Sequence, residues 1–452
     1  MLYCIGNKTQ YLERYGEWMK RKFIVSLLIA GISCGLVGCG ENAAQENEKQ
    51  TGTNNGSVVN LMENIDKSGV AEGSDANEEV ENMDVFCADT IDFSIELLQE
   101  NVASGETNVM VSPVSVLTAL AMTANGAEGE TLSQMQQVIG ENQTLDQMNQ
   151  NMKAWTDGLV NTEDTALKIA NSIWFKDEEE QIQVQEEFLQ KNAAYYQADI
   201  YKAPFDESTL ADINNWVSDK TEGRVTDILD KVPDEAVMYL INALAFDAEW
   251  QEIYFENQIQ DGIFCTADGE EQTVSFMYGE ESIYIQDDNA NGFIKPYKEG
   301  YSFVAILPKE GMTPAEYIAS LDGEQFQKLI DGQETTNVQT AIPKFEAEYE
   351  IQLSDILKEL GMRAVFDEEK ADLSSLGVSE EGNLYVNRVL HKTYISVDEK
   401  GTEAGAATAV EVACEMSLEM SYNVYLDRPF VYAIIEDQTN IPLFIGTVDS
   451  MD

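Results

Sequence analysis

Residues 397–412 read Val-Asp-Glu-Lys-Gly-Thr-Glu-Ala-Gly-Ala-Ala-Thr-Ala-Val-Glu-Val, a run of small residues without proline that precedes a short, methionine-rich polar stretch. Read with a period of two from Thr402 onward, the charged side chains Glu403 and Glu411 fall on one face. The other face carries only small or apolar side chains, at Thr402, Ala404, Ala406, Thr408, Val410, Val412 and Cys414. A strand this poor in large apolar residues cannot anchor an ordinary core. We therefore predict a segment that moves and that fits between two closely spaced strands.

The whole chain is strongly acidic. It has 452 residues, with 27 basic and 82 acidic side chains and a formal net charge of -55. Nucleic acid and anionic lipid repel such a surface, so neither is expected as a partner. The hydrophobic content of 44% is ample for a large core, and the length alone suggests two or three domains.

The N-terminal residues predict an export signal. Met19-Lys-Arg-Lys22 is positively charged, and residues 23–36 form an apolar run that is too short for a comfortable membrane span. The run ends in Leu36-Val-Gly-Cys39, which resembles the bacterial lipobox, whose cysteine is lipidated. We expect residues 1–38 to be an extension and a lipoprotein signal peptide. Cys39 would then anchor an extracellular protein to the bacterial membrane or cell surface, with plain secretion as the alternative.

Residues 39–83 are rich in Asn, Glu, Gly, Ser and Gln and almost free of aromatic side chains. Only residues 58–61 offer a short apolar stretch. Such a composition cannot bury enough surface to order itself. We predict that residues 39–83 are a disordered tether and that residues 84–452 are the globular part.

Helical and strand patterns alternate in the globular part. One helix is expected to begin at Ser112-Pro113, with Ser112 as the N-cap and Pro113 in the first helical position, and to end near Gly126. Further helices are predicted at residues 89–100, 145–161, 211–220, 314–321 and 353–361. Strands are predicted at 170–175, 239–246, 301–307, 384–397, 430–435 and 443–448, the last two as a hairpin. This mixture predicts an α+β fold.

Most catalytic chemistry is absent from the sequence. His391 is the only histidine, which removes most hydrolase triads and almost all zinc sites. No nucleophile elbow, Walker loop or dinucleotide-binding glycine pattern occurs. A single histidine within an apolar strand is most often a hydrogen-bonded core residue. These absences argue against a hydrolase triad, a metal site and a bound nucleotide cofactor.

Several separate blocks of the chain resemble the serpin family, and they occur in the family's order. They are residues 108–115 with Gly126-Ala127, 170–175, 241–246 with Trp250, 342–345, 360–362, 390–392, 427–430 and 443–446. The resemblance covers residues 84–452. It implies one domain, in place of the two or three suggested by length, with three β-sheets, eight or nine helices and an exposed reactive-centre loop.

The resemblance also gives the opening segment a role. Its residues match the hinge of the reactive loop in inhibitory serpins, at Glu399, Gly401, Thr402, Glu403, Ala404, Gly405, Ala406, Ala407 and Thr408. In that family a protease attacks the loop and forms an acyl-enzyme, and the hinge inserts as a central strand before water cleaves the ester. The resemblance implies a monomeric suicide inhibitor whose partner is a serine or cysteine protease.

Four further residues match the shutter, the polar network under the opening of the main serpin sheet: Ser112, Ser115, Asn242 and His391. Trp250 matches the breach, where the hinge first enters the sheet. These assignments give the single histidine a role in gating rather than in catalysis.

Counting seventeen loop residues from Glu399 places the scissile bond at Glu415-Met416. Met416-Ser417 is the second choice, and Cys414-Glu415, Leu418-Glu419 and Met420-Ser421 stay open. Glu415 suits a protease that accepts acidic residues, whereas Met416 suits an elastase-like pocket. No Lys or Arg lies between Lys400 and Arg428, which disfavours trypsin-like targets.

Two other functions remain as alternatives. A non-inhibitory serpin would act as a carrier or chaperone, but such members commonly have bulky, charged or proline residues in the hinge, and this chain does not. A surface solute-binding lipoprotein is the more remote alternative.

Overall fold

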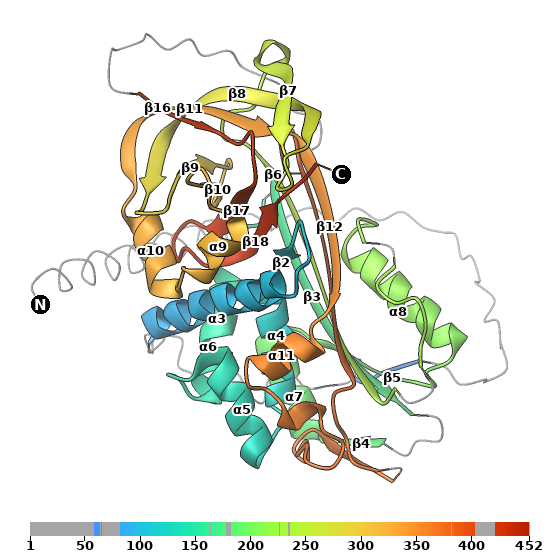
Figure 1. Ribbon diagram of the computed structural model, residues 1–452. Coiled ribbons are helices and arrows are strands. Elements are labelled where there is room, and N and C mark those ends of the chain that lie inside the picture. Colours follow the sequence, from blue (N-terminus) through green and yellow to red (C-terminus); the bar gives the residue numbers. More distant parts are fainter. Residues whose placement is uncertain are drawn as a thin grey trace, which may run out of the picture. The chain divides into compact units, whose positions relative to one another are not determined.

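The computed structural model describes residues 58–63, 65, 82–162, 164–177, 182–225, 227–233, 236–380, 382–402 and 421–451. All of them belong to the part of the chain from Gly56 to Asp452. Within these ranges there are nine α-helices, two 3-10 helices and strands that form three sheets (Figure 1). The expected α+β class, with three sheets and eight or nine helices, is confirmed.

The central sheet has seven strands, two of which are long neighbours in its middle, β3 and β6. In spatial order the strands are β1 (Val59–Asn60), β5 (Asp199–Ala203), β3 (Thr165–Lys176), β6 (Met238–Glu249), β15 (Gly401–Thr402), β14 (Arg388–Val397) and β12 (Phe345–Gln352). β15 lies between β6 and β14, which also pair directly with each other. The quoted segment therefore begins inside the central sheet.

The second sheet has nine strands. Eight follow one another in the order β16 (Ser421–Tyr425), β11 (Glu334–Pro343), β8 (Glu271–Gln286), β9 (Ala290–Pro296), β10 (Tyr301–Pro308), β17 (Phe430–Glu436), β18 (Pro442–Val448) and β2 (Met110–Val111), and β7 (Ile259–Cys265) pairs with β8. The third sheet consists of β4 (Ile182–Val184) and β13 (Gly377–Ser379). The predicted C-terminal hairpin is confirmed, because β17 and β18 pair antiparallel.

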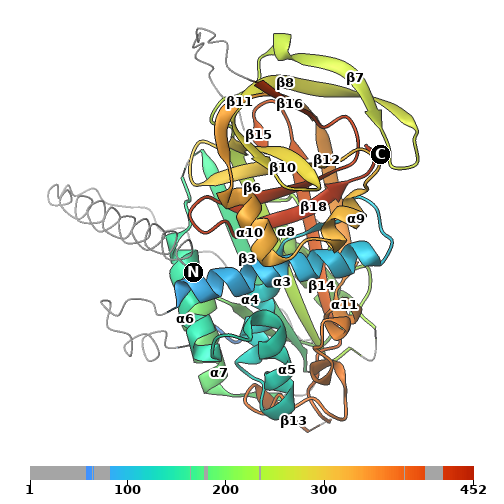
Figure 2. The ribbon, with the colours of Figure 1, turned by 60° about the vertical axis from the view of Figure 1, so that its left-hand side comes forward.

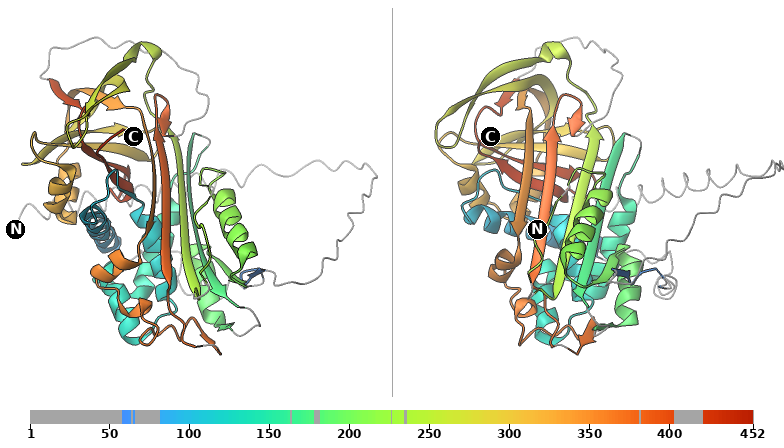
Figure 3. Two further views of the ribbon diagram at one scale, coloured as in Figure 1. Left: turned by 45° about the vertical axis from the view of Figure 1, so that its right-hand side comes forward. Right: turned by 90° about the vertical axis from the view of Figure 1, so that its right-hand side faces the viewer.

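Helices cover both faces of the central sheet. Figure 3 shows α8 (Glu207–Lys220), in green, against one face of the long strands, and Figure 2 shows α3 (Met83–Ala103) and α4 (Pro113–Ala124) against the other. The remaining helices are α5 (Gly129–Gly140), α6 (Leu145–Gly158), α7 (Glu186–Tyr196), α9 (Pro314–Ala319), α10 (Gly323–Asp331), α11 (Ser354–Glu359), η1 (Glu256–Gln258) and η2 (Ala364–Phe366).

α8 is amphipathic, and its apolar side explains its position. Ile213, Trp216 and Val217 are buried in one cluster with Trp174 of β3 and Tyr239 of β6. Burial of each such side chain contributes about 1.5–3 kcal/mol. The helix is therefore fixed against one face of β3 and β6.

α4 begins as expected but for a different reason. Ser112 is the N-cap and Pro113 follows it, yet the Ser112 side chain forms no capping hydrogen bond. All twelve residues of the helix are buried. Tertiary packing, rather than the cap, therefore fixes this helix.

The expected tether at residues 39–83 requires a correction. Its apolar stretch is not free of structure, because β1 pairs antiparallel with the edge strand β5, with Val59 opposite Lys202 and Asn60 opposite Tyr201. The Leu61 amide also donates to the Ile200 carbonyl at 2.8 Å. An edge strand has unpaired backbone groups, so even two residues gain hydrogen bonds there.

Candidate functional site

The hinge segment turns sharply at Asp398. Its Oδ1 accepts hydrogen bonds from the amides of Lys400 at 2.7 Å and Gly401 at 3.2 Å, and its own amide donates to the Gly401 carbonyl at 2.9 Å. Aspartate commonly stabilises such turns with its side chain. The turn sends the chain back beside β14, with Thr402 opposite Val397.

Gly401 allows the segment to enter between two strands. It lies opposite Glu249 of β6, and Thr402 lies opposite Ala248. A Cβ atom at position 401 would lie 2.0 Å from the Ala248 carbonyl oxygen. Since no side chain can occupy that space, glycine is required where the hinge passes β6.

Thr402 is the last described residue of the hinge and is fully buried. Its hydroxyl forms a 2.6 Å hydrogen bond with the phenol of Tyr297. The Tyr297 ring stacks on Trp250, with ring centroids 4.4 Å apart, and burial raises the pKa of its phenol. The polar group of Thr402 therefore has a partner inside the sheet, which a buried hydroxyl needs.

Trp250 and Tyr254 hold the backbone just before Thr402. The Trp250 amide donates to the Lys400 carbonyl and its indole Nε1 donates to the Asp398 carbonyl, both at 2.8 Å. The Tyr254 amide donates to the Glu399 carbonyl, also at 2.8 Å. The residue assigned to the breach thus contacts the hinge directly.

An ion pair joins Glu399, the first hinge residue, to Lys344, which lies between β11 and β12. The Lys344 ammonium contacts the Glu399 carboxylate, and this hydrogen bond keeps the pKa of Glu399 below its ordinary value. Both side chains are about one third exposed. Such pairs contribute little free energy.

Further from the hinge, residues 239–243 of β6 and 388–392 of β14 pair directly and in parallel, with no strand between them. Asn242 lies opposite His391 in this register. The His391 Nε2 accepts a hydrogen bond from the Ser112 amide at 3.0 Å, so Nδ1 carries the proton and donates to Asn242 Oδ1 at 2.6 Å. Burial lowers the pKa of His391 to about 3, which keeps the ring neutral.

The proposed shutter residues are only partly joined by hydrogen bonds. Ser112 contributes its backbone amide, while the hydroxyls of Ser112 and Ser115 form no hydrogen bond within the described part of the chain. Both serines are fully buried. The network that the sequence suggested is therefore centred on His391 and Asn242, and Ser115 lies beside it without joining it.

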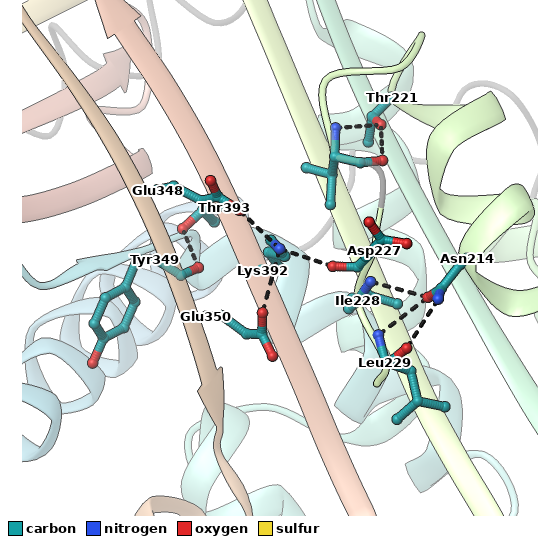
Figure 4. Close-up of polar contacts among 11 residues, drawn as sticks. Asn214, Thr221, Asp227, Ile228, Leu229, Glu348, Tyr349, Glu350, Lys392 and Thr393 are labelled. Carbon is teal, nitrogen blue, oxygen red and sulfur yellow. Dashed lines mark hydrogen bonds and ion pairs between the residues drawn. The ribbon is translucent and has the colours of Figure 1, made fainter. Parts of the chain in front are cut away.

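Figure 4 shows a second set of polar contacts across these strands, centred on Lys392, that the sequence did not predict. The Lys392 ammonium donates to the Asp227 carbonyl at 2.8 Å and pairs with Glu348 at 2.8 Å and Glu350 at 3.3 Å. It joins β14 and β12 to the segment that follows α8. The sequence does contain one signal for this contact, because Lys392 follows His391 in an apolar strand. Neighbouring residues in a strand face opposite sides of the sheet, so Lys392 must face the side away from His391.

Asn214 of α8 holds that segment in place. Its side-chain oxygen accepts hydrogen bonds from the amides of Ile228 and Leu229, and its nitrogen donates to the Leu229 carbonyl (Figure 4). These bonds measure 3.0, 3.1 and 2.9 Å. Any separation of β6 from β14 must therefore disturb the segment after α8.

The remaining predicted sites lie outside the described residues. They are the lipidation site Cys39, the hinge residues Glu403, Ala404, Gly405, Ala406, Ala407 and Thr408, and the reactive-bond residues Glu415, Met416 and Ser417. In the ranges that the structure describes, no three His, Cys, Asp or Glu side chains are grouped so as to hold a metal ion. No helix in those ranges is long and apolar enough to cross a membrane.

Comparisons with known proteins agree on one family. The family model described as Serpin (serine protease inhibitor) matches residues 88–451. Human Serpin B8 is 31% identical over 390 residues, which cover 81% of this chain and all of that protein. Mouse leukocyte elastase inhibitor A is 29% identical and covers 79% of this chain and 97% of its own length.

A solved structure gives the same result. The thermophilic serpin tengpin in its native state is 46% identical, with a TM-score of 0.81, over 87% of this chain and 99% of tengpin. The family model covers well over half of the chain, and the sheets described above are those of the serpin fold. The chain therefore belongs to the serpin family.

Proposed function

We propose that the protein inhibits a serine protease as a suicide substrate. The observation that carries this proposal is the position of β15, which enters between β6 and β14 at one end while these strands pair directly further down. A hinge already seated in this way has a path along which the following residues can insert. Small residues follow at positions 404–408, as insertion requires.

Insertion would supply the energy that traps the protease. The protease nucleophile attacks the scissile carbonyl, the scissile peptide bond breaks with its amine as the leaving group, and an ester joins the two proteins. About a dozen inserted residues, at roughly 0.5–1.5 kcal/mol of net free energy per hydrogen bond, would release on the order of 10 kcal/mol. The inhibitor is consumed, so the protein is an inhibitor and not an enzyme.

We infer Glu415-Met416 as the scissile bond, with Met416-Ser417 as the alternative. The name of the leukocyte elastase inhibitor relative supports an elastase-like target, which is compatible with methionine at the cut. We also propose that the protein is a monomer anchored outside the cell through lipid on Cys39, supported by the lipobox-like sequence alone.

The proposal is tested by incubating the protein with leukocyte elastase and with a Glu-specific protease. We expect a complex that survives denaturing electrophoresis and a released peptide that begins at Met416 by mass spectrometry. A peptide that begins at Ser417 would move the scissile bond by one residue. Cleavage within residues 403–420 without any covalent complex, for both proteases, would overturn inhibition and favour the carrier or chaperone alternative.

A further inference from the structure

Lys295 is a buried cation that the steps above do not use. It lies in β9 and is 2% exposed. Its ammonium pairs with the Glu281 carboxylate of β8 at 2.7 Å, and both side chains are at least nine-tenths buried. Desolvation raises the pKa of Glu281, while Lys295 opposes that shift. Burying two charges costs several kcal/mol, and packing alone would be served by apolar side chains.

The ammonium makes its other contacts with one short turn, residues 250–254, which follows β6. It donates to the Glu252 carbonyl at 3.1 Å. It also lies 4.5 Å from the centroid of the Tyr254 ring and 5.2 Å from that of Trp250, which are favourable cation–π distances. A single group thus contacts the beginning, middle and end of the turn.

The same turn holds the hinge on its other side. The amides of Trp250 and Tyr254 donate to the carbonyls of Lys400 and Glu399. A cavity of about 430 Å³ adjoins the turn and is lined by Glu252, Tyr254, Glu281 and Lys295, among others. Because packing is incomplete at this cavity, the turn depends on the ammonium for its position.

We propose that Lys295, held by Glu281, is a positioning residue that fixes the turn at 250–254 so that its amides seat the hinge in the central sheet. The local part of this inference concerns only the turn and the hinge. Its consequence for inhibition rests on the proposed function, because a poorly seated hinge would insert too slowly to trap the acyl-enzyme before hydrolysis.

Hydrogen exchange measured by mass spectrometry on the intact protein tests the local part. Lys295→Met keeps an unbranched apolar side chain that is one atom shorter and removes the ammonium. We expect exchange of the Trp250 and Tyr254 amides to become about tenfold faster or more, since these amides lose their fixed acceptors. Unchanged exchange at these two positions in a folded variant would overturn the proposal.

Lys202→Met is the matched control. Lys202 forms another largely buried ion pair, with Asp177 at 2.9 Å, and lies in β5, which does not adjoin the hinge. The same substitution there removes a paired ammonium whose side chain is 18% exposed, against 3% for Lys295. We expect it to leave exchange at Trp250 and Tyr254 unchanged, and an equal increase in both variants would show a general loss of stability and overturn the specific role of Lys295.

A double variant separates positioning from the cost of an unpaired charge. Lys295→Met/Glu281→Leu removes both charges and should recover thermal stability relative to Lys295→Met. The donor to the Glu252 carbonyl is still absent, so exchange at the turn should stay fast. Recovery of slow exchange in the double variant would contradict the proposal. If Lys295→Met does not fold, the double variant provides the same exchange test.

The consequence for inhibition is measured with leukocyte elastase as the number of inhibitor molecules consumed per protease molecule inactivated. Lys295→Met should raise this number severalfold while the rate of loop cleavage stays constant. An unchanged number alongside faster exchange would overturn the link to inhibition. If the wild-type protein forms no complex with any protease, the proposed function fails, whereas the exchange result still decides the role of Lys295.

Discussion

The two ends of the interface between β6 and β14 are built differently. At one end Gly401 and Thr402 separate these strands, and each hinge residue faces β6. At the other end residues 388–392 pair directly with residues 239–243, and His391 bonds to Asn242 across the interface. The hinge therefore enters an interface that is open at one end and closed by its own ladder at the other.

This difference indicates the direction in which the sheet opens. Insertion along the whole length of the two strands would require the direct pairing at residues 388–392 to break. His391 and Lys392 lie at the end of that pairing and would be reached first, since the register ends at Lys392 opposite Ala243. Under the proposed mechanism, the open end would favour entry of the loop, and the closed end would hold the native arrangement until the loop is cut.

The largest expected effect comes from a charge at the open end. Thr402→Arg would bury a cation where the hydroxyl now meets Tyr297, at a cost of several kcal/mol. We expect roughly a tenfold or greater rise in inhibitor consumed per protease inactivated, with the protein cut as a substrate. Thr402→Ser is the control, because it keeps the hydroxyl. Full complex formation by Thr402→Arg on denaturing gels would show that inhibition does not depend on a small residue at this position.

A pH effect is expected at the closed end. The folded-state pKa of His391 is lowered to about 3, so the unfolded chain binds a proton near pH 6.5 that the folded protein does not. The stability that neutral His391 contributes is therefore present above pH 6.5 and is lost as the pH falls toward 3, by about 1.4 kcal/mol per unit.

Urea unfolding of wild type and His391→Gln from pH 7 to pH 4 measures this effect. The free-energy difference between the two proteins should shrink as the pH falls, because both share every other titrating group. A difference that is constant with pH would mean that His391 is not held neutral in the fold.

A smaller effect is expected at Lys392, on the α8 face of the same strands. Lys392→Met removes the hydrogen bond to the Asp227 carbonyl and the pairs with Glu348 and Glu350. A hydrogen bond from a charged group is worth about 1.5–3 kcal/mol, so the free energy of unfolding should fall by an amount of that order. Exchange of the Ile228 and Leu229 amides should also increase. If neither quantity changes, Lys392 does not tie the segment to the sheet.

The smallest effect is expected for the ion pair at Glu399. Both partners are about one third exposed, so Glu399→Gln should change the free energy of unfolding by less than about 1 kcal/mol. Its effect should vanish as the pH falls through the lowered pKa of Glu399, because the carboxylate is then neutral in both states. A double-mutant cycle with Lys344→Met checks this, and a coupling of several kcal/mol would make the pair a principal hinge anchor.

The sequence predicted much of the fold because its patterns are local. The start of α4 at Pro113, the strand at 239–246 within β6 and the hairpin of β17 and β18 all follow from caps, apolar runs and turns. The strand predicted at 384–397 begins later, at Arg388. The short pairing of β1 could not be predicted, since two residues gain their stability only from a distant edge strand.

The site was predictable only through family resemblance. The period of the hinge indicated a strand, but not that Thr402 meets Tyr297, which is 105 positions away. The buried contacts of Lys295 and Lys392 could not be predicted, because a lysine in a strand pattern is usually exposed. Their partners also come from other strands or loops. Contacts between distant segments depend on how the sheets pack, which local patterns do not encode.

The most direct test of the central claim is thermal unfolding before and after a single cut within residues 403–420, made with a protease that does not form a complex. If the hinge enters an interface built to open, cutting releases the loop, the central sheet gains a strand, and the midpoint of unfolding rises by tens of degrees. An unchanged or lower midpoint after the cut would contradict insertion and, with it, the proposed mechanism of inhibition.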